Sequence, residues 1–119
     1  MPSLVVDNLL HRNLPPLAAG VRFASPFADY AGAERVAPLL AVMPDVFDEL
    51  AVVRELRGDD DEVAVLLRGR CGDETVDVMV DERHDDAGAV SDMMIMVRPL
   101  SGTKAVIARM GALMRDTDR

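Results

Sequence analysis

The sequence predicts an α+β domain in which helices pack on one face of a curved antiparallel sheet. Three observations support this class. Apolar residues recur at helical spacing before residue 44, alternate with polar residues from residue 47 to residue 98, and return to helical spacing after Pro99. A chain of 119 residues is long enough for one domain with a substantial core. We therefore expect residues 1–119 to form a single domain.

The N-terminal part predicts two helices with a short strand between them. Ser3 is expected to cap a short helix that ends before the first proline pair. A brief strand is predicted at residues 21–23. Gly32 then opens a second helix, which Pro44 stops, and Pro38 inside it predicts either a kink or the true first turn.

The middle of the chain predicts a meander of four strands joined by short, polar, glycine-bearing turns. Its last two strands form a long hairpin around Asp85-Asp86-Ala87-Gly88. A final helix follows Pro99, with one apolar stripe along it. The expected strands cover residues 50–56, 63–67, 76–80 and 90–98, and the stripe consists of Val106, Ile107, Met110, Leu113 and Met114.

Composition excludes several classes of function. A formal charge of −8 opposes the phosphate neutralisation that nucleic-acid binding requires, so no nucleic-acid partner is expected. Cys71 is the only cysteine, which excludes an intrachain disulfide and fits a reducing compartment. The sequence shows no signal-peptide pattern. Its longest apolar run, residues 36–43, is well short of the ~20 residues of a membrane helix. We expect a cytoplasmic protein with no membrane partner.

The two strands of the long hairpin differ in how their residues alternate. In the first, Val76, Val78 and Val80 are expected to face inward and Asp77 and Asp81 outward. The last strand is apolar on both parities, so one face should meet the helices and a pocket while the other meets a second subunit. We assign Met94, Met96 and Arg98 to the pocket, and we expect a homodimer through the outer sheet face.

His84 and Asp81 are the candidate catalytic residues. An imidazole near the end of a pocket-facing strand can act as a general base at neutral pH. The structural alternatives are a strand-end histidine that touches solvent and an aspartate on a solvated or dimer-facing edge. Glu82 shares the parity of His84 and reaches it only if the strand is regular to its end, because a bulge would reverse the faces.

No metal site and no cofactor are expected. The acidic run Asp59-Asp60-Asp61-Glu62 lacks the ligand alternation and the glycine of a calcium loop, so it predicts a solvated hairpin tip. Two histidines and one cysteine scattered along the chain do not form a structural zinc pattern.

Several short segments, in this order and spacing, carry a family resemblance. The segments are Phe23-Ala24-Ser25-Pro26, Tyr30-Ala31-Gly32, Val46-Phe47-Asp48, Asp85-Asp86-Ala87-Gly88 and Met96-Val97-Arg98-Pro99-Leu100. Over roughly residues 14–115, the chain resembles a nuclear transport factor 2-like (SnoaL-like) domain of bacterial type. The resemblance implies a cystatin-like α+β roll, in which a curved sheet wraps around about three helices and leaves a deep apolar pocket.

The resemblance also bears on function. The family includes ketosteroid isomerases, limonene-epoxide hydrolases, scytalone dehydratases, polyketide cyclases and non-catalytic binding modules, so the fold alone does not decide the activity. It implies that members often dimerise through the outer sheet face, and it places Tyr30 at the pocket rim. Phe23, Val78 and Val80 are the remaining pocket candidates.

The chain departs from the family in two places. Its N-terminal helix is short, so either the pocket is more open or a partner chain covers it. The position of the strand aspartate of ketosteroid isomerases corresponds here to Val80, and no catalytic acid of the family matches residue by residue.

Three hypotheses follow. The first is a homodimer whose apolar pocket binds a small hydrophobic molecule. The second is an isomerase, dehydratase or hydrolase with His84 or Asp81 as base and Tyr30 as hydrogen-bond donor. The third is a structural interaction module whose pocket is filled by its own methionines.

Overall fold

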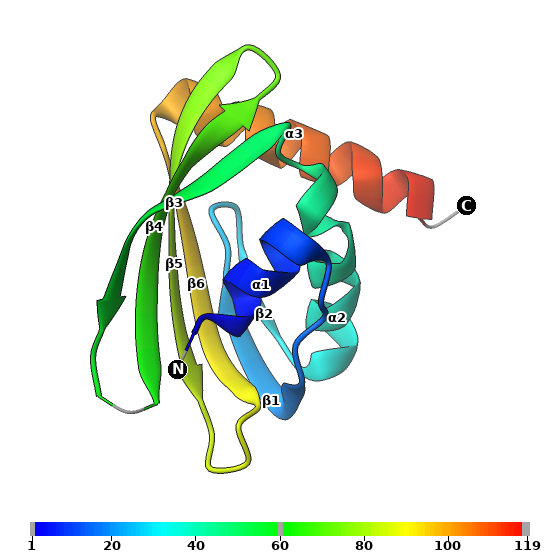
Figure 1. Ribbon diagram of the computed structural model, residues 1–119. Helices are drawn as coiled ribbons and strands as arrows, with labels where there is room; N and C mark the ends of the chain where they lie inside the picture. The colour runs from blue at the N-terminus through cyan, green and yellow to red at the C-terminus, as the bar shows by residue number, and fades with distance from the viewer. Residues whose placement is uncertain (1, 60, 118–119) are drawn as a thin grey trace.

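The computed structural model describes residues 2–59 and 61–117, so Asp60 of the acidic hairpin tip lies outside the described residues. Three α-helices and six strands follow one another along the chain, and the helices lie on one side of a strongly twisted sheet (Figure 1). The elements are α1 (Leu4–His11), β1 (Leu17–Ala24), β2 (Asp29–Ala31), α2 (Ala33–Val42), the 3₁₀ helix η1 (Met43–Asp45), β3 (Glu49–Arg57), β4 (Glu62–Cys71), β5 (Glu74–His84), β6 (Val90–Arg98) and α3 (Leu100–Thr117).

The six strands form one mixed sheet in the order β2-β1-β6-β5-β4-β3. The four-strand meander is confirmed as β3 to β6, and the α+β class is confirmed with it. The N-terminal part contains more strand than expected. β1 starts at Leu17 rather than at residue 21, and β2 was not predicted. β1 pairs in parallel with β6, a contact between distant parts of the chain that local patterning does not reveal.

The helices begin where their capping residues predict. The Ser3 hydroxyl caps α1 by accepting a hydrogen bond from the backbone N–H of Val6 at 3.0 Å. Gly32 precedes α2 with a φ of 95°, a left-handed conformation that favours glycine. Pro38 lies inside α2, so it does not mark the first turn of this helix. Within the described chain, no helix is both long and apolar enough to cross a membrane.

Alternation along β5 sets the two faces of the sheet. Val76, Val78 and Val80 are buried and face the helices, as expected, whereas Asp77 and Asp81 are on the other face. Val80 is directly opposite Ile95 on β6. Because directly opposed residues in antiparallel strands point to the same face, Ile95 faces inward.

The expected face of β6 is therefore corrected. Met93 and Ile95 are buried on the inner side, while Met94, Met96 and Arg98 lie on the outer side. The sequence could not show which of the two sets of alternating residues faces inward, because both sets on this strand are apolar. The register with β5 decides it.

A row of ion pairs crosses the outer face beside these methionines. The Asp77 carboxylate accepts hydrogen bonds from Arg68 Nε at 2.9 Å and from Arg98 Nη1 at 2.7 Å. These hydrogen bonds, first from Arg68 and then from Arg98, lower the pKa of Asp77 below its usual value. A carboxyl group with a lowered folded-state pKa stabilises the fold above its unfolded-state pKa of about 3.9, and this contribution is lost as the pH falls through the lower folded value.

We predict that Asp77→Asn flattens the acid limb of the stability profile. The variant should be less stable than the wild type at pH 7, and the difference should shrink as the pH falls below about 4, where the wild-type carboxyl becomes protonated. Urea unfolding midpoints measured between pH 2 and pH 7 would test this. Asp29→Asn is the matched control, because Asp29 makes no ion pair in the described part of the chain. Parallel pH profiles for wild type and Asp77→Asn would contradict the prediction.

Candidate functional site

An apolar cleft of about 660 Å³ opens between the inner face of the sheet, α2, α3 and the tip of the β1–β2 hairpin. Its walls are almost entirely hydrophobic side chains. α1 contributes Leu9, the sheet contributes Phe23, Tyr30, Val78, Ile95 and Val97, and α3 contributes Val106, Ile107, Met110 and Met114. The volume lies within the ~300–1,000 Å³ typical of small-molecule sites. The lining therefore suits an apolar guest.

The structure brings three of the seven predicted pocket residues to this cleft. Phe23 and Tyr30 lie side by side on β1 and β2, with ring centroids 6.0 Å apart, and Val78 lines the wall beneath them. Val80 is fully buried beside the cleft without bordering it. The other three predicted residues are Met94, Met96 and Arg98, which lie on the opposite face of the sheet.

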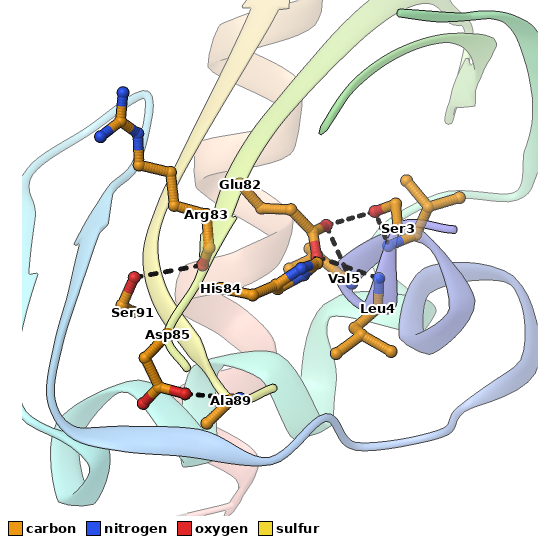
Figure 2. A network of polar contacts seen from close by, with 10 residues as sticks. Ser3, Leu4, Val5, Glu82, Arg83, His84, Asp85, Ala89 and Ser91 are labelled. Atoms are coloured by element: carbon orange, nitrogen blue, oxygen red, sulfur yellow. Dashed lines mark hydrogen bonds and ion pairs between the residues drawn. The ribbon is translucent and has the colours of Figure 1, made fainter. Parts of the chain in front are cut away.

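A buried polar cluster lies at the junction of α1 and β5 (Figure 2). The Glu82 carboxylate is 1% exposed and accepts four hydrogen bonds. Oε1 accepts from the Ser3 hydroxyl and from the Val5 N–H at 3.2 Å, and Oε2 accepts from the Leu4 N–H at 3.0 Å and from His84 Nε2 at 2.6 Å. The negative charge also lies at the positive end of the α1 dipole. Glu82 thus fixes the start of α1 to the sheet.

His84 completes this cluster from the inner side of β5. The sequence predicts a contact between Glu82 and His84 only if the strand is regular to its end. The register between β5 and β6 shifts between Arg83 and His84, and the contact still forms. His84 Nδ1 is buried and has no hydrogen-bond partner among the described residues. Because a carboxylate oxygen only accepts, the hydrogen bond to Glu82 places a proton on His84 Nε2.

Neither catalytic candidate borders the apolar cleft. The imidazole of His84 is buried in the cluster with Glu82, rather than at a solvated strand end. Asp81 lies on the outer side and borders a second hollow, of about 640 Å³, together with Met94 and the polar side chains of Arg22 and Asp92. Tyr30 borders both hollows.

The arrangement favours binding over acid–base chemistry in the apolar cleft. Among the described residues that line it, none is a carboxylate or an imidazole, and the Tyr30 hydroxyl is the one polar ring substituent. Residues 2–59 and 61–117 also contain no group of three or more His, Cys, Asp or Glu side chains placed to hold a metal ion. A general base for a cleft-bound substrate would have to come from elsewhere.

Sequence reasoning missed the attachment of Glu82 to α1 and the position of Arg115 at the cleft. Glu82 lies on the same inward-facing side of the strand as Val78 and Val80, and an acidic residue among apolar ones was the signal that the sequence offered. Its partner Ser3, however, is 79 residues away in the chain. Arg115, at the C-terminal end of α3, borders the apolar cleft and was not singled out. A single arginine near a helix end carries no sequence signal of this kind.

Comparison with known proteins places this geometry in context. No model of a known protein family matches the chain, and no curated protein matches it. Among solved structures, a steroid delta-isomerase from Pseudomonas aeruginosa is 33% identical, with a TM-score of 0.81 over 85% of this chain and 76% of that chain.

Two further structures support the fold. An uncharacterised bacterial protein with a cystatin-like fold from Silicibacter pomeroyi is 24% identical, with a TM-score of 0.74 over 81% of this chain and 69% of that one. A SnoaL-like protein of unknown function from Burkholderia thailandensis is 18% identical, with a TM-score of 0.55 over 70% and 75%. The open curved sheet, the helices on its inner face and the 33% identity to the steroid delta-isomerase show that the chain belongs to the nuclear transport factor 2-like (SnoaL-like) superfamily.

Proposed function

We propose that this protein binds a small hydrophobic molecule in the cleft between the sheet and α3. The observation that carries the proposal is the lining: a cleft of about 660 Å³ whose walls are apolar and which contains no carboxylate or imidazole among its described lining residues. Burial of apolar surface is the main driving force available to such a site, at roughly 25 cal/mol per Å². The Tyr30 hydroxyl, which has no hydrogen-bond partner in the described chain, is free to orient a ligand oxygen.

Filling the cleft should weaken binding. Met110 lines the cleft from α3, and Met110→Trp places a bulky indole in the space that a ligand would occupy. We predict that this variant binds the neutral apolar dye Nile red at least about tenfold more weakly than the wild type, a loss of ~1.4 kcal/mol. A fluorescence titration measures the affinity.

Leu14→Trp is the matched control, because Leu14 is 57% exposed and does not line the cleft. It should leave dye binding unchanged, and circular dichroism should show both variants folded. If Met110→Trp binds the dye as tightly as the wild type does, the cleft is not the binding site.

The second candidate is a double-bond isomerase that acts on a steroid. The 33% identity to the steroid delta-isomerase favours it. The positions of the acids count against it, because Glu82 and His84 are enclosed in the α1 cluster and Asp81 is on the outer face. Ultraviolet absorbance would follow the conversion of a steroid with an unconjugated double bond into its conjugated isomer. Turnover that disappears in Asp81→Asn or His84→Gln would establish the enzyme, and its absence in the wild type would remove this candidate.

We also propose that two copies of the chain associate through the outer sheet face. Leu66, Met79 and Met96 are direct cross-strand neighbours there and form an apolar row. The ion-pair row of Arg68, Asp77 and Arg98 lies alongside it. An apolar centre with a polar border is typical of subunit interfaces.

Light scattering at micromolar concentration should therefore give twice the 12.9 kDa mass of the chain. Met79→Glu should shift the protein to the monomer, since it buries an unpaired charge at the centre of the row. Leu14→Glu, at an exposed residue in the segment before β1, should leave the mass unchanged. A wild-type monomer would overturn the proposal.

A further inference from the structure

The lining of the apolar cleft carries a positive charge, whereas the chain as a whole is negatively charged. The chain carries a net charge of −8, with 21 acidic side chains. None of these acidic side chains is among the described residues that line the cleft, and the single charged lining residue is the guanidinium of Arg115. A cation at the edge of an otherwise apolar site is a specific feature, because hydrophobic ligands alone do not require it.

The Arg115 side chain folds back over Gly111 at the edge of the cleft. Gly111 lies one turn earlier on α3 and also lines the cleft. A Cβ atom at Gly111 would come within 3.3 Å of Arg115 Nη1, so the guanidinium folds back over the glycine along the helix. Arg115 makes no ion pair or hydrogen bond with any described residue. Its charge is therefore available to a ligand.

The mouth of the cleft carries a second unpartnered group. Phe27 lies at the tip of the β1–β2 hairpin, borders the cleft and is 72% exposed. The tip is held in shape by the Ser25 hydroxyl, which donates to the Ala28 carbonyl and accepts from the N–H groups of Phe27 and Ala28. An exposed aromatic ring on a fixed turn is suited to contact with the apolar body of a guest that enters beside it.

We propose that the ligand is an amphipathic anion, with its apolar chain in the cleft and its carboxylate at Arg115. This inference rests on the proposed binding function and adds the chemical class of the ligand. A guanidinium pairs with a carboxylate through charge-assisted hydrogen bonds, and because Arg115 is exposed, water screens the pair and the expected preference is modest. Phe27 packs against the part of the chain nearest the mouth.

Calorimetric titration of the full chain at pH 7.5 tests the proposal, with dodecanoate kept below its critical micelle concentration and dodecanol below its solubility limit. The two probes share a chain and differ in the charge of the head group. We expect dodecanoate to bind about three- to tenfold more tightly than dodecanol. Arg115→Gln should remove this preference by weakening dodecanoate alone.

Lys104→Gln is the matched control, because it removes one positive charge from an exposed part of the same helix that does not line the cleft. It should leave both affinities unchanged. Equal binding of the two probes, or loss of the preference in Lys104→Gln to the same extent as in Arg115→Gln, would overturn the anion assignment while the binding function stands. Failure of both probes to bind would overturn the binding function as well.

Discussion

Glu82→Ala is expected to lower the free energy of unfolding by about 3–5 kcal/mol, the range measured when one partner of a buried, hydrogen-bonded charge is removed. The substitution leaves four donors without an acceptor at one place: the Ser3 hydroxyl, two backbone N–H groups of α1 and His84 Nε2. Each buried donor without a partner costs roughly 1–3 kcal/mol, and relaxation of α1 limits the total. Urea unfolding followed by circular dichroism measures the loss.

Two comparison variants make this result interpretable. Glu74→Ala removes an acid from the same strand whose partner is the exposed Ser101 hydroxyl, so it should cost less than about 1 kcal/mol. Glu82→Gln keeps one acceptor oxygen and should be less damaging than Glu82→Ala, which keeps the comparison possible if the alanine variant does not fold. A Glu82→Ala cost equal to that of Glu74→Ala would mean that the cluster does not stabilise α1.

Gly69→Ala is expected to destabilise the protein by about 2–3 kcal/mol, at the upper end of the usual range for overpacking. Gly69 lies on β4 opposite Leu50 of β3. A Cβ atom there would lie 2.0 Å from the backbone oxygen of Glu49 and 2.9 Å from its carbonyl carbon. Backbone atoms cannot rotate away as a side chain does, so β3 must separate from β4 along part of its length.

Gly20→Ala provides the control for Gly69→Ala. Gly20 also lies in a strand, β1, but a Cβ atom there would meet nothing within 4 Å. We expect its free energy of unfolding to change by less than about 1 kcal/mol, with stabilisation the favoured direction because alanine restricts the unfolded chain. Thermal unfolding of both variants distinguishes a steric effect from a general intolerance of side chains in the sheet. Equal stability of the two variants would contradict the steric explanation.

The meander and the faces of β5 could be predicted from the sequence because local alternation determines them. Val76, Val78 and Val80 share one parity, and Asp77 and Asp81 lie on the other, so a single inward face satisfies the pattern. β6 shows no such difference between its two faces, since Met94 and Met96 are as apolar as Met93 and Ile95. Its face depends on pairing with β5, which is a property of the register.

The candidate site was less predictable than the fold. Tyr30 and Phe23, which the sequence analysis assigned to a pocket, line the cleft. The position of His84 depends on a contact with Glu82, and the position of Glu82 depends on α1. Hydrogen bonds between residues 79 positions apart leave no periodic trace in a sequence. Arg115 belongs to the cleft because α3 crosses it at that point, which follows from packing of the helix on the sheet.

The parallel pairing of β1 with β6 has a consequence for the order of folding. β1 belongs to the first quarter of the chain, yet its neighbours in the sheet are β6 and the three-residue β2. During synthesis β1 must therefore wait until the meander has been made, and so must the Glu82 contact that secures α1. Pairing over this separation must overcome more loop-closure entropy than hairpin formation does. We expect the meander and α3 to be the nucleus of folding, with the N-terminal segment docking last.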